Sequence, residues 1–287
     1  MQDKQVELYE VGPRDGLQNE PKKIATTDKI ALVNSLNEVG FSLIEATSFV
    51  SPKWVPQLGD ASALMAGIER KKGVRYAVLT PNMRGYEDAR NAQADEIAVF
   101  GAASEGFSQK NINCTIEESL ERFRPVVKAA LRDNIAARGY ISVVTHCPYD
   151  GAVPAQAVLD MAEAMLDMGC YEISLGDTTG HATPETVSAL LDVVAKKLPP
   201  KILVGHFHDT RNRAVENVMI CLEYGIRKFD ASVSGLGGCP FSPGAKGNVS
   251  TKLLHDKLTE KGWHTGLDRQ ALERSEALVA QMGITPR

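Results

Sequence analysis

The chain has 287 residues, of which 43% are hydrophobic and 24% are charged, the proportions of an ordinary globular protein. A net charge of −4 and the lack of a basic block argue against binding to nucleic acid or to an anionic membrane surface. No apolar run reaches the roughly 18 residues of a membrane span. Residues 1–5 lead directly into a strand pattern without a signal or transit peptide, so we expect a cytoplasmic protein.

Short β-rich runs alternate with amphipathic helical segments along the chain. The predicted strands are, in order, 6–11, 43–47, 75–79, 96–100, 139–144, 172–175, 202–204 and 228–233. Helical segments are predicted at 27–39, at 115–132 after a capping box, after a cap at Thr183, and at 213–224 and 249–261. Such alternation predicts a parallel sheet covered by helices.

Eight strand–helix units over about 250 residues are the count and length of a TIM barrel, the (β/α)8 fold, which we therefore predict. The alternative is a doubly wound open sheet, which would favour Gly-x-Gly-x-x-Gly after the first strand. The chain instead has Gly-Pro-Arg-Asp-Gly at 12–16. Without a linker or an internal repeat, we expect one catalytic domain over 1–287, with a further helix in 267–287.

The five cysteines are odd in number and widely spaced, and no Cys-x-x-Cys occurs, so neither a disulfide framework nor a thiolate zinc site is expected. Cys114, Cys170 and Cys221 fit small buried hydrophobic residues. Cys239 differs, because it lies in a glycine-rich loop at 235–248. We interpret it as a reactive group on a mobile loop.

Two histidines separated by one residue, His206 and His208, follow the apolar run 202–204. Alternate side chains of a strand point to the same face, so both imidazoles could be directed at one metal ion. The alternative is a pair of buried, hydrogen-bonded histidines. The choice depends on whether other strands supply partners.

In a TIM barrel the active site lies at the carboxyl ends of the strands. Asp15 follows the first predicted strand and can reach His206 and His208, because the first, seventh and eighth strands are neighbours in a closed barrel. Such a nitrogen and oxygen donor set suits Mg²⁺, Mn²⁺, Fe²⁺ or Zn²⁺. Asp15 and Asp177 could instead cap turns, and Glu45, inside an apolar strand, could instead pair with an arginine.

Over residues 6–266 the chain resembles the family of 3-hydroxy-3-methylglutaryl-CoA lyases, within a wider group of divalent-metal TIM barrels that includes isopropylmalate and homocitrate synthases. The resemblance rests on Gly-Pro-Arg-Asp-Gly-Leu-Gln-Asn-Glu at 12–20, the segment 44–57, and Gly-His-Phe-His-Asp-Thr at 205–210. The loop at 235–240 is similar to the lyase signature with its catalytic cysteine, which the synthases lack.

The resemblance implies retro-Claisen cleavage of 3-hydroxy-3-methylglutaryl-CoA to acetyl-CoA and acetoacetate, in a homo-oligomer. It implies an Mg²⁺ or Mn²⁺ ion that chelates the substrate and lowers the pKa of its 3-hydroxyl group. Arg14 would stabilise the enolate and Cys239 would protonate it. His206 would also move a proton, and Glu45 and Asp177 would support the acid–base network. The implied metal ligands are Asp15, His206, His208 and Asn248.

The chain departs from the family pattern at several positions that we expect on loops at strand ends. These positions are Thr145, His146, His181, Arg211, Arg213 and Lys252. They leave two further hypotheses open. One is a lyase of the same mechanism that acts on a different 3-hydroxyacyl-CoA, and the other is a non-catalytic barrel that binds CoA esters.

Overall fold

The structure is a computed structural model that describes residues 4–239 and 242–284, with their side chains except at 238–245. Eight parallel strands close into a barrel in the order β1-β10-β9-β8-β5-β4-β3-β2. They are β1 (Glu7–Glu10), β2 (Leu43–Ser48), β3 (Arg75–Leu79), β4 (Glu96–Ala102), β5 (Ala136–Ser142), β8 (Glu172–Asp177), β9 (Leu203–Phe207) and β10 (Lys228–Ala231). The predicted TIM barrel is confirmed.

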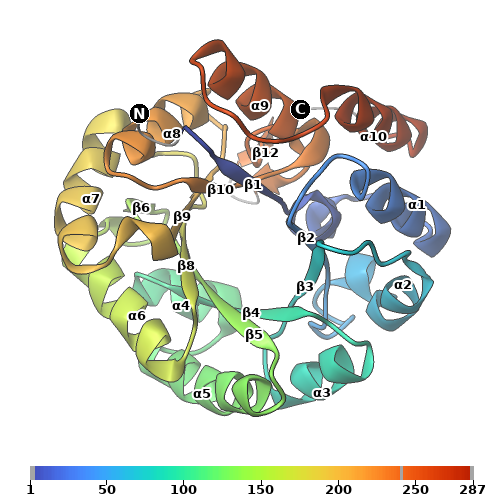
Figure 1. Ribbon diagram of the computed structural model, residues 1–287. Helices are drawn as coiled ribbons and strands as arrows, with labels where there is room; N and C mark the ends of the chain where they lie inside the picture. The colour runs from blue at the N-terminus through green and yellow to red at the C-terminus, as the bar shows by residue number, and fades with distance from the viewer. Residues whose placement is uncertain (1–3, 240–241, 285–287) are drawn as a thin grey trace.

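Helices form a ring outside the strands, as Figure 1 shows. They are α1 (Thr26–Leu36), α2 (Ala61–Gly67), α3 (Met83–Asn91), α4 (Glu105–Ile112), α5 (Ile116–Arg132), α6 (Ala155–Met168), α7 (Pro184–Lys197), α8 (Ala214–Glu223), α9 (Thr251–Glu260) and α10 (Arg269–Gln281). Their buried apolar side chains and those of the strands form one large hydrophobic cluster between the two layers. Within the described ranges, no helix combines the length and apolar character needed to cross a membrane.

The helix starts follow the predicted capping residues. Thr115 and Glu118 form the capping box of α5, and Thr183 caps α7 ahead of a proline in its first turn. Each capping side chain accepts a hydrogen bond from a backbone N–H group that the helix itself leaves unpaired.

Strand β5 differs from its predicted range, 139–144. Asn134 adopts a left-handed conformation with a φ of 58° after α5, so the chain turns and enters the strand early, at Ala136. Val143 has a φ of 57°, which is strained for a β-branched residue and ends the strand at Ser142. The residues after β5 therefore leave the strand pairing, although the Val144 N–H still donates to the Gly176 carbonyl of β8.

Strand β9 continues beyond its predicted end, because residues up to Phe207 pair with β8 and residues up to His206 pair with β10. Two short hairpins lie outside the barrel sheet. One joins β6 (His146–Cys147) and β7 (Gly151–Ala152), and the other joins β11 (Gly238–Cys239) and β12 (Ser242–Lys246) within the glycine-rich loop. Gly247 in that loop is required by close packing, because a Cβ atom there would lie 2.3 Å from the Gly237 backbone.

Candidate metal centre and active site

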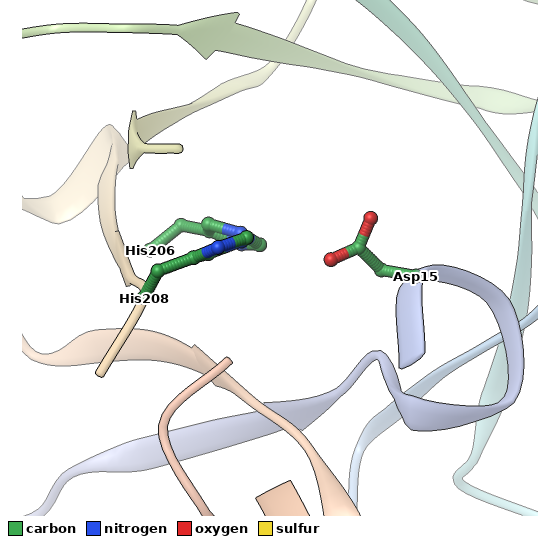
Figure 2. A group of neighbouring side chains, drawn as sticks. All are labelled: Asp15, His206 and His208. Carbon is green, nitrogen blue, oxygen red and sulfur yellow. The ribbon is translucent and has the colours of Figure 1, made fainter. Parts of the chain in front are cut away.

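Asp15, His206 and His208 lie together at the carboxyl end of the barrel. Each offers one ligand atom, and these atoms all lie within 4.8 Å of one another. Figure 2 shows the two imidazoles side by side, facing the Asp15 carboxylate. Asp15 lies in η1 (Gly12–Gly16), a single helical turn after β1, and the histidines come from β9 and the residue after it. The barrel order β1-β10-β9 brings these segments together, as the sequence predicted.

His206 is oriented by Asp230 on the neighbouring strand. The two residues are partners in the β9–β10 register, and His206 Nδ1 lies 3.1 Å from Asp230 Oδ2. Arg138 and Ser174 each donate to the same carboxylate at 2.7 Å. Although burial alone would raise the pKa of Asp230, Arg138 and His206 lower it to about 2. The ionised Asp230 therefore holds the proton on Nδ1 and leaves Nε2 as the ligand atom.

The His208 ring has no polar partner in the described part of the structure. Its Nδ1 is buried without a hydrogen bond. Burial and the charge of His206 lower the pKa of His208 to about 4, so the ring is neutral near pH 7. A neutral imidazole with an unsatisfied nitrogen is suited to bind a cation.

Asn248 joins the site through both backbone and side chain. Its backbone forms an antiparallel bridge with His208, and its Nδ2 donates to Asp15 Oδ2 at 2.7 Å and to the Leu236 carbonyl at 3.2 Å. Both of these bonds use the amide nitrogen, so the amide oxygen remains as the possible ligand atom.

Asp15 is held ionised and in position. Its Oδ1 accepts from Arg14 Nη1 at 2.7 Å and from Gln18 Nε2 at 2.8 Å. Burial would raise the pKa of Asp15, but the charges of Arg14 and the two histidines lower it to about 2. The carboxylate is therefore available to a cation across the pH range of a cell.

Glu45 pairs with Arg14, which was the alternative left open from the sequence. Arg14 Nε donates to Glu45 Oε2 at 2.7 Å, and the Tyr140 hydroxyl donates to the same oxygen at 3.2 Å. Burial raises the pKa of Glu45 and Arg14 opposes that shift. Glu45 Oε1 is buried, and no group of the described residues forms a hydrogen bond with it. One carboxylate oxygen thus fixes Arg14 while the other remains uncommitted.

Asp177 lies beside the metal ligands but serves the loop after β8. Its two oxygens accept hydrogen bonds from the backbone N–H groups of His181 at 3.1 Å and Ala182 at 3.0 Å. Burial raises the pKa of Asp177 to about 6. This geometry corresponds to the turn-capping alternative, and Asp177 is not one of the clustered ligand atoms.

Lys252 was expected on a strand-end loop near the site, but it lies in the first turn of α9 and pairs with Asp256 at 3.0 Å. That expectation was wrong, because the helix begins immediately after its Ser250 cap.

The side chain of Cys239 lies outside the described side chains, so its role as an acid stays a prediction.

Asp230, Arg138 and Tyr140 were missed from the sequence. The sequence feature that could have revealed these three residues is their position as polar or charged side chains within otherwise apolar strands. Their partners become apparent only once β5, β8, β9 and β10 are aligned.

The donor set fits a divalent metal. One carboxylate, two imidazoles and an amide oxygen are ligands that such ions accept, and the neutral, unsatisfied His208 is a polar group in need of a partner. A closed parallel barrel with these donors at its carboxyl end defines the class of metal-dependent TIM-barrel enzymes. Within this class, the family model described as HMGL-like matches residues 5–279, and the chain belongs to that family.

The chain is similar to several named relatives. It is 48% identical to the mitochondrial hydroxymethylglutaryl-CoA lyase of Macaca fascicularis, over 97% of this chain and 86% of the relative. It is 51% identical to the cytoplasmic 3-hydroxy-3-methylglutaryl-CoA lyase of Mus musculus, over 92% of this chain and 77% of the relative. The crystal structure of the HMG-CoA lyase from Brucella melitensis is 56% identical, with a TM-score of 0.96 over 97% of this chain and 98% of that one.

Proposed function

We propose that the protein cleaves 3-hydroxy-3-methylglutaryl-CoA to acetyl-CoA and acetoacetate in a reaction that depends on a divalent metal ion. The observation that supports this most is the cluster of Asp15, His206 and His208, with Arg14 bonded to Asp15 at 2.7 Å. The proposed ligands are these three residues and Asn248, and the proposed ion is Mg²⁺ or Mn²⁺. A CoA ester as substrate agrees with an HMG-CoA lyase from Acinetobacter baumannii, solved with coenzyme A and 3-methylmalate and 37% identical to this chain.

The chemistry that a divalent cation supplies here is Lewis-acid polarisation, which lowers the pKa of a coordinated hydroxyl group. Glu45 is the residue we assign to accept the hydroxyl proton. Glu45 is suited to this role because Oε1 is buried and forms no hydrogen bond with a described residue, while Oε2 is fixed by Arg14. His206 is assigned to metal binding, because its Nδ1 proton faces Asp230 and its Nε2 is the proposed ligand atom, so no nitrogen remains to accept a proton. Asp177 supports the acid–base network by holding the loop after β8 beside the histidines.

Loss of the 3-hydroxyl proton breaks the bond between carbons 2 and 3. The 3-oxygen becomes the ketone of acetoacetate, and the bonding electrons pass to carbon 2 as the enolate of acetyl-CoA. Arg14 is assigned to stabilise the enolate oxygen, because the described residues take up its Nε and Nη1 but form no hydrogen bond with Nη2. Cys239 then donates its thiol proton to carbon 2, which completes acetyl-CoA.

The test is a substrate panel. Purified protein loaded with Mg²⁺ or Mn²⁺ is incubated with 3-hydroxy-3-methylglutaryl-CoA and with other 3-hydroxyacyl-CoA esters, and the products are quantified by mass spectrometry. We expect acetyl-CoA and acetoacetate in equal amounts, and the Asp15→Asn variant is the inactive control. Equal or faster cleavage of another thioester would assign the same mechanism to a different acyl group. No cleavage of any ester would reject the proposal.

A further inference from the structure

We propose that His146, His181 and Arg211 form an oxyanion-binding subsite at the mouth of the barrel, which holds a negatively charged group of the substrate outside the metal centre. The ligand chemistry is a carboxylate of the acyl part or a phosphate of the CoA part. The identity of this ligand as a CoA ester rests on the proposed function, whereas the anion site itself rests on the geometry of the three side chains.

The three side chains come from three successive loops at the carboxyl end. His146 follows β5, His181 follows β8 and Arg211 follows β9, and these strands are neighbours in the barrel. The His146 and His181 rings stack with centroids 4.4 Å apart and an angle of 20° between their planes. Arg211 Nη2 lies 2.6 Å from His181 Nε2. All three positions are departures from the family pattern, and here they contact one another as a unit.

The hydrogen bonds define the state of His181. A guanidinium group can only donate, so His181 Nε2 must be the acceptor and carry no proton. The remaining proton is then on Nδ1, which lies 3.2 Å from the Thr179 carbonyl oxygen. In agreement, burial, together with the charges of Arg211 and His146, lowers the pKa of His181. His181 is therefore a neutral ring fixed between a backbone carbonyl and Arg211.

Arg211 keeps an uncompensated charge. Among the residues with described side chains, no carboxylate forms an ion pair with it. The Asp177 carboxylate is used elsewhere, because its two oxygens accept backbone hydrogen bonds from the loop after β8. A guanidinium held by a neutral imidazole retains N–H donors for an incoming carboxylate or phosphate.

The subsite adjoins the metal centre. The His208 N–H lies 3.4 Å from the Asp177 carbonyl, and a Cβ atom at Gly180 would lie 3.0 Å from the His208 carbonyl. A substrate bound at the metal ligands therefore has its nearby parts within reach of the loops that bear His181 and Arg211.

The loop of Arg211 is also tied to the glycine-rich loop. Thr210 Oγ1 donates to the Lys246 carbonyl at 2.9 Å, and Lys246 Nζ donates to Asn212 Oδ1 at 2.6 Å. The cationic group is thus held on a loop with two anchors, which limits the entropy lost when an anion binds.

The experiment measures binding by calorimetry in Mg²⁺-loaded protein, with ligands that cannot be cleaved. Four ligands are compared: coenzyme A and three thioether analogues. The analogues are those of 3-hydroxy-3-methylglutaryl-CoA, of 3-hydroxy-3-methylglutaryl-pantetheine and of citryl-CoA. The pantetheine ligand lacks the nucleotide, and the citryl ligand has a carboxylate in place of the 3-methyl group. The variant is Arg211→Gln. The matched control is Arg213→Gln, which removes the same charge from an exposed position on the same loop.

If the anion is a CoA phosphate, Arg211→Gln weakens binding of every CoA ligand by about ten-fold or more and leaves the pantetheine ligand unchanged. If it is an acyl carboxylate, the loss falls on ligands with that carboxylate and spares coenzyme A. Arg213→Gln should change each dissociation constant by less than about two-fold. A second variant, His181→Phe, keeps a ring against His146 but frees Arg211, and should weaken the same ligands by about three-fold.

The subsite is rejected if Arg211→Gln binds all four ligands within about two-fold of the parent, or if Arg213→Gln shows the same losses. Because none of these ligands is cleaved, the result is independent of turnover. A parent that binds the analogues through Arg211 but cleaves no thioester would overturn the proposed function and retain the subsite.

Discussion

The two ends of the barrel interior both hold buried charges, but they differ in how those charges are paired. At the amino end, Glu172 contacts Arg138 at 3.3 Å and also Lys228, and Arg75 contacts Glu96 at 2.7 Å. At the carboxyl end, the buried Nδ1 of the His208 side chain forms no hydrogen bond with any described residue. Glu96, Glu172 and Arg138 also leave one buried atom each without a hydrogen bond, but each of them has an ion-pair partner, whereas the His208 ring has none among the described residues. Charges that neutralise one another position strands, and a buried polar ring without any partner indicates where a ligand binds.

Asp230 connects the two ends. Its Oδ1 accepts from Arg138 at 2.7 Å, and its Oδ2 faces His206 Nδ1 at 3.1 Å. Arg138 at the amino end, acting through Asp230, therefore fixes the orientation of His206, a proposed metal ligand at the carboxyl end. Substitutions at each end, and at Asp230 itself, separate the contributions of these groups.

The largest effect is expected for His208→Gln. The variant removes a proposed metal ligand without breaking an internal hydrogen bond in the described structure, because the His208 side chain makes none. We expect kcat/KM to fall by on the order of a thousand-fold, since metal polarisation contributes several kcal/mol. Steady-state assays check this, with melting temperatures of the metal-free proteins as the folding control. Activity within about ten-fold of the parent would remove His208 from the metal site.

At the amino end, Arg138→Met should act on stability. Arg138 is 1% exposed, and its loss leaves the buried carboxylates of Glu172 and Asp230 without this cation. Breaking such buried pairs costs about 3–5 kcal/mol in the free energy of unfolding, measured by denaturant titration. Lys71→Met breaks an exposed pair with Glu38 and should cost less than about 1 kcal/mol. Equal effects of the two variants would contradict the account of the amino end.

Asp230→Asn tests the connection between the ends. An amide in place of the carboxylate no longer fixes the His206 proton on Nδ1, so Mn²⁺ affinity should fall by about ten-fold to a hundred-fold. Calorimetric titration with Mn²⁺ measures this. Ser174→Ala removes a hydrogen bond to the same carboxylate but leaves the His206 contact in place, and should have a smaller effect. An unchanged Mn²⁺ affinity in Asp230→Asn would show that His206 does not depend on Asp230.

Glu10 is a buried acid that forms no ion pair with a described residue, and it should affect the pH dependence of stability. It accepts hydrogen bonds from the N–H groups of Gly12 and Val233 at 2.8 Å, and burial raises its pKa to about 7 from a usual 4.5. A raised carboxyl pKa contributes stability that is fully present below pH 4.5 and is lost as the pH rises through 7. In the parent relative to Glu10→Gln, a shift from 4.5 to about 7 corresponds to a loss of up to about 3 kcal/mol. Denaturant titrations from about pH 4.5 to 8 check it, and parallel pH curves would refute it.

Periodicity within one strand was enough to predict the core of the metal site. The alternation that places His206 and His208 on one face, and the position of Asp15 directly after β1, depend on local spacing and barrel order. The partners across strands could not be predicted in the same way. Asp230 faces His206 because of the register of β9 with β10, and the His146–His181 stack joins two loops whose conformation, including the positive φ at Val143, no periodicity predicts.

Metal-dependent cleavage is tested most directly by titrating metal-stripped protein with Mn²⁺ while measuring acetyl-CoA release from 3-hydroxy-3-methylglutaryl-CoA. We predict negligible release without metal and a rate that rises to a plateau at one Mn²⁺ per chain. Full activity in the stripped protein, or a plateau that His208→Gln reaches equally well, would contradict the central claim that Asp15, His206 and His208 bind the metal that the reaction needs.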